Sequence, residues 1–193
     1  TGDAIVDMKT GRQVTIKELG NDAMCQNDIA LEATESHFSP TSPPPYMAGA
    51  AEIDIDPETG HIELLDFAAV VDCGTVINPA LARVQVEGGL VQGIGMALTE
   101  DVIMTQGGRI LTNSFMQYRI PTRQDLGQVR VEFAPSYEPN GPFGAKSIGE
   151  VVINTPGPAI AHAVYNAVGV WMRELPITAE KVYMALKQKK QNC

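Results

Sequence analysis

The chain has 193 residues, of which 44% are hydrophobic, so it is long and apolar enough to build one ordinary core. A formal net charge of −9 argues against nucleic acid as a partner, since that requires a basic footprint. No apolar run reaches the roughly 18 residues of a membrane span. The cysteines Cys25, Cys73 and Cys193 are too widely spaced for a metal motif or a disulfide framework, which favours a cytoplasmic setting.

The first 38 residues predict a small unit distinct from residues 39–193. Residues 4–8 are typical of a short strand, and residues 9–12 of a turn. Thr15 and Glu18 have the spacing of a capping box that opens a short helix. Four prolines between residues 36 and 45 then exclude a regular helix and predict an extended connector.

A β-hairpin is predicted next. Residues 50–55 alternate apolar and acidic side chains, as a half-buried strand does. Residues 56–60 contain proline and glycine at positions that suit a turn, and residues 62–71 form a second, largely apolar strand.

Asn78 and Pro79 predict the start of a long helix that runs to about Thr99, because asparagine caps helices and proline suits the first helical position. Glycine inside a helix costs about 1 kcal/mol relative to alanine. Four such glycines therefore need a reason, which is either close packing of neighbouring elements or close approach of a bulky ligand. These are Gly88, Gly89, Gly93 and Gly95.

The last third of the chain predicts a strand over 129–133, a loop over 140–144, and two helices. Thr155 and Pro156 would open a helix to about Met172, and Thr178 would cap one to about Gln188. The first helix has an apolar stripe at spacings of three and four, made by Ile160, Val164, Val168 and Trp171. Because hairpins and helices occur in separate blocks, the predicted fold class is α+β.

One face of the predicted long helix carries Gln85, Gly89, Gln92 and Met96. Two carboxamides and a glycine are unusual for a core-facing stripe, since buried amides need hydrogen-bond partners. Such a face suits a planar ligand with several donors and acceptors.

A second candidate segment runs from Gly144 to Glu150, where Glu150 lies between Gly149 and an apolar run. Apolar surroundings raise the pKa of a carboxyl group toward the range of a general base. The competing interpretation is a solvated turn residue, because most acidic side chains are exposed. The three histidines, His37, His61 and His162, are isolated and predict no metal site.

These segments resemble the end of the molybdenum-binding portion of xanthine dehydrogenases, aldehyde oxidases and their relatives. The resemblance covers roughly residues 39–186 and rests on three stretches: Asp72 to Gly95, Tyr118 to Thr122, and Gly144 to Glu150. It implies the C-terminal segment of a molybdopterin-binding domain, with residues 1–38 only weakly matched.

The resemblance also implies roles. Glu150 would be the base that takes the proton from a metal-bound hydroxyl, whose oxygen attacks a heteroaromatic (purine- or nicotinate-like) or aldehyde carbon. Gln85, Lys146 and Gly149 would bind the molybdopterin cofactor: Gln85 would lie close to the pterin, and Lys146 and Gly149 belong to the loop that presents the glutamate near the metal. Iron–sulfur clusters and FAD would lie on other chains.

Since the family's molybdenum portion is several times longer than this chain, activity is expected only with partner subunits or a missing N-terminal segment. The alternatives are a catalytically incomplete fragment and an interaction module that binds no cofactor alone.

Overall fold

The computed structural model describes residues 3–25, 32–36, 38 and 40–191. The chain forms two compact units, Thr1–Phe38 and Ser39–Cys193. His37 and Cys193, both considered above, lie outside the described residues.

The first unit is a small hairpin followed by a helix. Strands β1 (Ala4–Val6) and β2 (Gln13–Thr15) pair antiparallel, and helix α1 spans Ile16–Cys25. The predicted capping box is confirmed: the Thr15 amide donates to the Glu18 carboxylate over 2.9 Å, and the Glu18 amide donates to the Thr15 hydroxyl over 3.1 Å. These bonds satisfy amides that the first turn leaves without a partner.

A three-stranded sheet organises the second unit. Its order is β3 (Tyr46–Ile55), β4 (Ile62–Asp72) and β5 (Gln128–Phe133), with β3 antiparallel and β5 parallel to the central β4. The predicted hairpin is confirmed, although β3 begins four residues earlier than expected, at Tyr46. Because β4 and β5 are parallel, both end at the same edge of the sheet, near Asp72 and Phe133.

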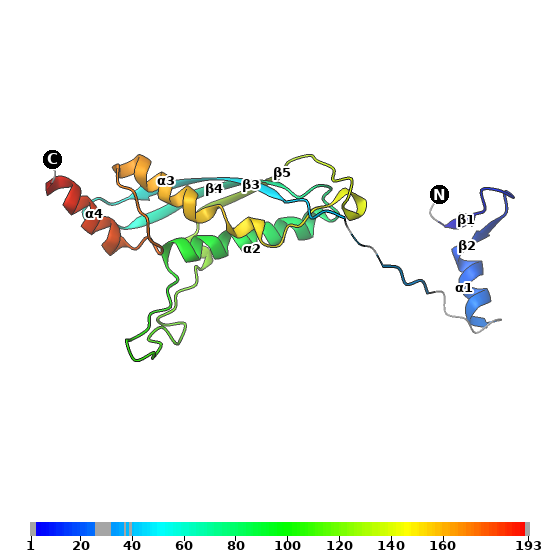
Figure 1. The fold of residues 1–193 in the computed structure, drawn as a ribbon, viewed down its shortest axis with the longest axis horizontal. Helices are drawn as coiled ribbons and strands as arrows, with labels where there is room; N and C mark the ends of the chain where they lie inside the picture. Colours follow the sequence, from blue (N-terminus) through cyan, green and yellow to red (C-terminus); the bar gives the residue numbers. More distant parts are fainter. Residues whose placement is uncertain (1–2, 26–31, 37, 39, 192–193) are drawn as a thin grey trace. The chain divides into compact units, whose positions relative to one another are not determined.

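The helices cover one face of this sheet. Helix α2 (Pro79–Leu98) contacts β5, and α3 (Pro156–Val168) contacts β3 and α2 (Figure 1). Alternate residues of the strands face them, and the most deeply buried side chains of the core come from this interface. They include Phe67, Val71, Val86, Leu90, Ile94, Ile160 and Val164. The opposite face of the sheet is exposed, with Val70 and Arg130 on it.

The C-terminal helices begin where the sequence predicts but differ in detail. Helix α3 ends at Val168 rather than Met172, because Gly169 adopts a left-handed conformation and stops it. Trp171 therefore lies outside the helix and is exposed, stacked on Tyr165 at 4.3 Å, so its assignment to the buried stripe was wrong. Helix α4 spans Ala179–Gln191, and Thr178 accepts the predicted capping bond from the Lys181 amide.

None of the helices in the described part of the chain is both long and apolar enough to cross a membrane.

Candidate functional site

The two candidate segments meet in space. Gln85 donates from Nε2 to the carbonyl oxygen of Gly149 over 3.2 Å, which joins positions 64 residues apart. A groove of about 660 Å³ lies along this contact. Its wall consists of one side of α2 and the segment that follows the contact: Val84, Gln85, Gly88, Gly89, Gln92, Gly149, Glu150, Val152, Ile153 and Asn154.

Helix α2 presents its polar side to this groove because its apolar side is held by the core. Asn78 caps the helix by accepting a hydrogen bond from the Leu81 amide over 3.1 Å, as predicted. Val86 and Leu90 are fully buried against the sheet, so Gln85 and Gln92 remain exposed. The carboxamides are thus open to a ligand rather than satisfied inside a core.

The helical glycines divide between the two proposed reasons. A Cβ on Gly89 would lie 2.1 Å from Val152 Cγ2, and one on Gly93 would lie 2.7 Å from Pro156 Cγ. These two positions are explained by close packing of α2 against the segment after Glu150. Gly88 is different, because a Cβ there would meet nothing within 4 Å. Its side of the helix opens into the groove.

The loop that carries Glu150 is fastened to the end of β4. The Thr75 amide donates to the Gly144 carbonyl and the Lys146 amide to the Cys73 carbonyl, each over 2.7 Å. Gly74 lies at the centre of this contact with a φ of 67°, and a Cβ there would come 2.2 Å from the Gly144 oxygen. Glycine is therefore required at this close approach of two backbones.

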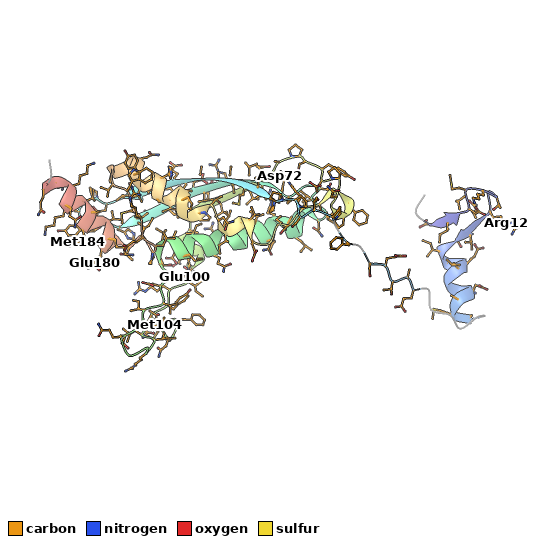
Figure 2. All side chains as sticks on the ribbon, viewed as in Figure 1. Arg12, Asp72, Glu100, Met104, Glu180 and Met184 are labelled. Carbon is orange, nitrogen blue, oxygen red and sulfur yellow. The ribbon has the colours of Figure 1, made fainter. Side chains whose placement is uncertain are left out.

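Lys146 forms an ion pair at the same place. Its Nζ lies 2.6 Å from Asp72 Oδ2, and only 9% of its side chain is exposed. Asp72, labelled in Figure 2 at the end of β4, also accepts hydrogen bonds from the Ser136 hydroxyl and the Gly74 amide. The hydrogen bond from Lys146, followed by that from Ser136, lowers the pKa of Asp72 from 3.8 to about 2.

A second hollow of about 420 Å³ adjoins the groove and shares Gln85 and Gly149 with it. Lys146 and the buried Cys73 belong to its wall. Burial raises the pKa of the Cys73 thiol, which favours its neutral form. The Gln85–Gly149 contact thus separates a polar groove from a more apolar hollow.

Glu150 immediately precedes the short 3₁₀ helix Val151–Ile153 and is exposed. Its carboxylate makes no hydrogen bond or ion pair with the other described residues. The apolar enclosure expected from the sequence is therefore not provided by these residues, because Val152 turns into the core instead. What the chain does provide is a free carboxylate on the wall of the groove.

The structure thus brings Gln85, Gly149 and Glu150 together, whereas the Lys146 ammonium is held by Asp72. Sequence reasoning missed Asp72 as a member of the site, although its place at the end of a predicted strand, two residues before Gly74, was a signal. His61 and His162 are exposed, and the described residues contain no cluster of three His, Cys, Asp or Glu side chains able to hold a metal ion.

Comparison with known proteins gives the family. Residues 2–127 match the family model of the molybdopterin cofactor-binding domain. The chain is 39% identical over 160 residues to a probable hypoxanthine oxidase of Escherichia coli (strain K12), covering 82% of this chain and 17% of that protein. It is 40% identical over 144 residues to the gamma subunit of the 6-hydroxypseudooxynicotine dehydrogenase complex of Paenarthrobacter nicotinovorans. The match covers 72% of this chain and 18% of that subunit.

Solved structures agree. The Cu,Mo-CO dehydrogenase in its carbon monoxide-reduced state matches with a TM-score of 0.83 and 26% identity, over 100% of this chain and 25% of that one. Quinoline 2-oxidoreductase from Pseudomonas putida 86 matches with a TM-score of 0.69 and 34% identity, over 72% of this chain and 18% of that one. In each case this chain spans a quarter or less of the relative. The chain belongs to the molybdopterin cofactor-binding family of xanthine dehydrogenase/aldehyde oxidase-type molybdenum oxidoreductases.

Proposed function

We propose that this chain is the C-terminal segment of the molybdopterin-binding part of a molybdenum hydroxylase, with Glu150 as the base. The enzyme would oxidise a heteroaromatic or aldehyde substrate with oxygen derived from water, and only in association with the rest of the domain and its partner chains. The observation that carries the proposal is the Gln85–Gly149 contact, which puts Gln85 and Glu150 on one groove.

The residues of the groove suit a pterin. Gly88 and Gly149 both belong to its wall, and a Cβ on either would meet nothing within 4 Å, so there is space for a flat molecule. Gln85 uses its amide nitrogen on Gly149, which leaves its oxygen free to accept from the ligand. The bound cofactor would supply the redox chemistry.

Glu150 would receive the proton during the reaction. Its carboxylate has no partner among the described residues, so both oxygens are available to a donor at the groove. A carboxylate serves as a general base when it lies within hydrogen-bond reach of the proton that it removes. Closure of the groove by the rest of the domain would exclude water around it.

Lys146 would act through the loop rather than on the cofactor. Its ammonium is already engaged by Asp72, and its backbone amide by Cys73. This role replaces the direct cofactor contact expected from the sequence. Gly149 would contribute its carbonyl to Gln85 and its lack of a side chain to the groove.

The names of the relatives support the substrate class. They include a probable hypoxanthine oxidase, a quinoline oxidoreductase and aldehyde oxidoreductases, whose names specify heteroaromatic rings or aldehydes, whereas the carbon monoxide dehydrogenases are named for another substrate. Others are a complex subunit and a large chain, which supports the existence of partner chains. The iron–sulfur clusters and FAD implied by the family resemblance would lie on those chains.

The test is Glu150→Gln in the assembled enzyme, with Glu180→Gln as the control. Glu180, labelled in Figure 2, is an exposed carboxylate on α4 and is not part of the wall of the groove. Loss of the base should lower turnover by about 100-fold or more, the usual contribution of general base catalysis, while molybdenum content stays at the wild-type level.

Unchanged turnover in Glu150→Gln would remove this residue from the base role. An assembly that contains no molybdenum in its wild-type form would favour the alternative of a non-catalytic fragment or interaction module. Equal losses of turnover in both variants would point to a general effect of charge.

A further inference from the structure

An apolar arm projects from the end of α2. The arm comprises residues 101–120, between α2 and the 3₁₀ helix Arg123–Asp125 (Figure 1). Its two sides pair around a tip at Gly108: the Thr105 amide donates to the Arg109 carbonyl over 2.9 Å, and the Leu111 amide to the Ile103 carbonyl over 2.8 Å. The sequence predicted no element here.

The base of the arm is fixed to the helix. The Tyr118 hydroxyl donates to Glu100 over 2.6 Å, and the Thr99 hydroxyl donates to the Arg119 carbonyl over 2.8 Å. Gly95 allows Glu100 to lie against α2, because a Cβ there would come 2.0 Å from Glu100 Oε1. The arm therefore leaves α2 in a direction that specific contacts set.

Beyond this base the arm exposes large apolar side chains. Phe115 and Met116 are 83% and 84% exposed, and Met104, labelled on the arm in Figure 2, is 61% exposed. The arm contains only three charged residues, Asp101, Arg109 and Arg119. A short paired loop is marginally stable alone, and large apolar side chains exposed together on one segment mark an interaction site.

We propose that the arm docks onto the remainder of the molybdopterin-binding polypeptide, the part that the relatives carry and this chain does not span. The arm lies inside residues 2–127, which match the domain family, so it is an element of that domain rather than an appendage. The Cu,Mo-CO dehydrogenase chain matches all of this chain with only 25% of its length, which leaves three quarters to supply a partner surface.

Docking of the arm would also fix the position of the groove relative to the rest of the domain. The arm starts at the C-terminal end of α2, and Gln85 lies near the N-terminal end, about 20 Å back along the same helix at 1.5 Å per residue. A helix held at its far end by the arm carries Gln85 into a fixed position against the remaining part of the domain. The partner surface should be apolar, since the arm offers few charges.

Methionine oxidation tests this without any measurement of turnover. The protein, purified from its source with the chains that accompany it, is treated with dilute hydrogen peroxide, and the sulfoxide at each methionine is quantified by mass spectrometry. Met184 on α4, which is 48% exposed, is the internal control. From this chain alone Met104 and Met116 should oxidise faster than Met184, because they are more exposed.

Docking predicts the reverse order, with Met104 and Met116 about tenfold slower than Met184 because a covered thioether is inaccessible to peroxide. Oxidation of the arm methionines at or above the Met184 rate would overturn the proposal. The proposal would also be overturned if the arm methionines are protected but a Met116→Glu variant halves the particle mass and keeps its molybdenum. That combination identifies a second copy of the chain as the occupant of the arm surface.

Met116→Glu should instead lower molybdenum per chain and make Met104 accessible to peroxide, whereas Met184→Glu should leave both unchanged. The proposal rests on the proposed function only in taking this chain as one part of a molybdopterin-binding polypeptide. Because peroxide protection does not depend on Glu150, failure of the base assignment and failure of the docking assignment are separable.

Discussion

Lys146 Nζ and Asp72 Oδ2 are 2.6 Å apart, although 74 residues separate them in the sequence. The pair joins the end of β4 to the loop whose tip is Glu150. Because Gly149, the neighbour of that glutamate, is also held by Gln85, the loop is fixed on both sides of Ser147 and Ile148. The position of the candidate base therefore depends on this ion pair and this amide contact, together with the backbone hydrogen bonds that fasten the loop to the end of β4.

The ion pair predicts a stability that depends on acid pH. The pKa of Asp72 is about 2 in the folded chain against an ordinary 3.8, so its contribution is complete above about pH 4 and is lost as pH falls toward 2. Asp72→Asn should lower the free energy of unfolding by about 2 kcal/mol at pH 7. In urea titrations from pH 7 to pH 2, the difference from wild type should shrink with acidity. A difference that is constant with pH would contradict this.

Gln85 is predicted to matter more than its neighbour Gln92. Both are exposed on the groove, but only Gln85 hydrogen-bonds the Glu150 loop. Loss of one hydrogen bond of about 1 kcal/mol corresponds to about a fivefold effect. Gln85→Ala should lower molybdenum retention or turnover of the assembled enzyme by that factor or more, beyond the effect of Gln92→Ala. Equal, wild-type values for both variants would leave Gln85 a packing residue.

Two adjacent glycines of α2 should respond oppositely to alanine. Gly88→Ala meets nothing within 4 Å and should raise the free energy of unfolding of the chain by up to about 1 kcal/mol, since alanine favours the helix. Gly89→Ala would press on Val152 and should lower that free energy by about 1–3 kcal/mol. Chemical denaturation of both variants checks this.

The enzyme with its cofactor bound provides a second test of Gly88. If the cofactor occupies the space beside Gly88, alanine there should lower molybdenum content even though it stabilises the chain. Normal molybdenum content in Gly88→Ala would place the cofactor away from that glycine.

Replacement of Thr155 by valine is predicted to stabilise the fold. The sequence suggested a helix cap, but its side chain makes no capping bond, and its buried hydroxyl has no partner among the described residues. A buried hydroxyl without a partner costs about 1–3 kcal/mol. Thr155→Val keeps the shape and should raise the thermal unfolding midpoint. A lower midpoint would show that the hydroxyl has a partner in solution.

Local signals predicted the helix starts because capping residues act within a few positions. Asn78 and Thr178 cap as expected, whereas Thr155 does not, since proline alone suffices to start α3. The end of α3 was misplaced although Gly169 marked it, because apolar spacing continued past that glycine to Trp171. The arm gave no signal, since its apolar residues follow no helical or strand period.

The site was only partly predictable for a different reason. Gln85 and Glu150 were identified by resemblance, and their shared groove required the fold. The partnership of Lys146 with Asp72 follows from the isolated antiparallel bridge between Gly74 and Ala145, just beyond the end of β4, which no local pattern encodes. Enclosure of Glu150 was expected from its apolar neighbours, but Val152 packs inward against Gly89 and leaves the carboxylate open.

The long sequence separation between α2 and the segment that carries Glu150 also bears on when the groove appears during folding. The contacts that build it span 64 and 74 residues, and contacts of such long sequence separation form slowly because a large loop must close first. Hairpin β3–β4 and helix α2 can assemble earlier from near neighbours. The groove would thus be completed only when the segment that carries Glu150 packs against α2, and cofactor insertion would have to await that contact.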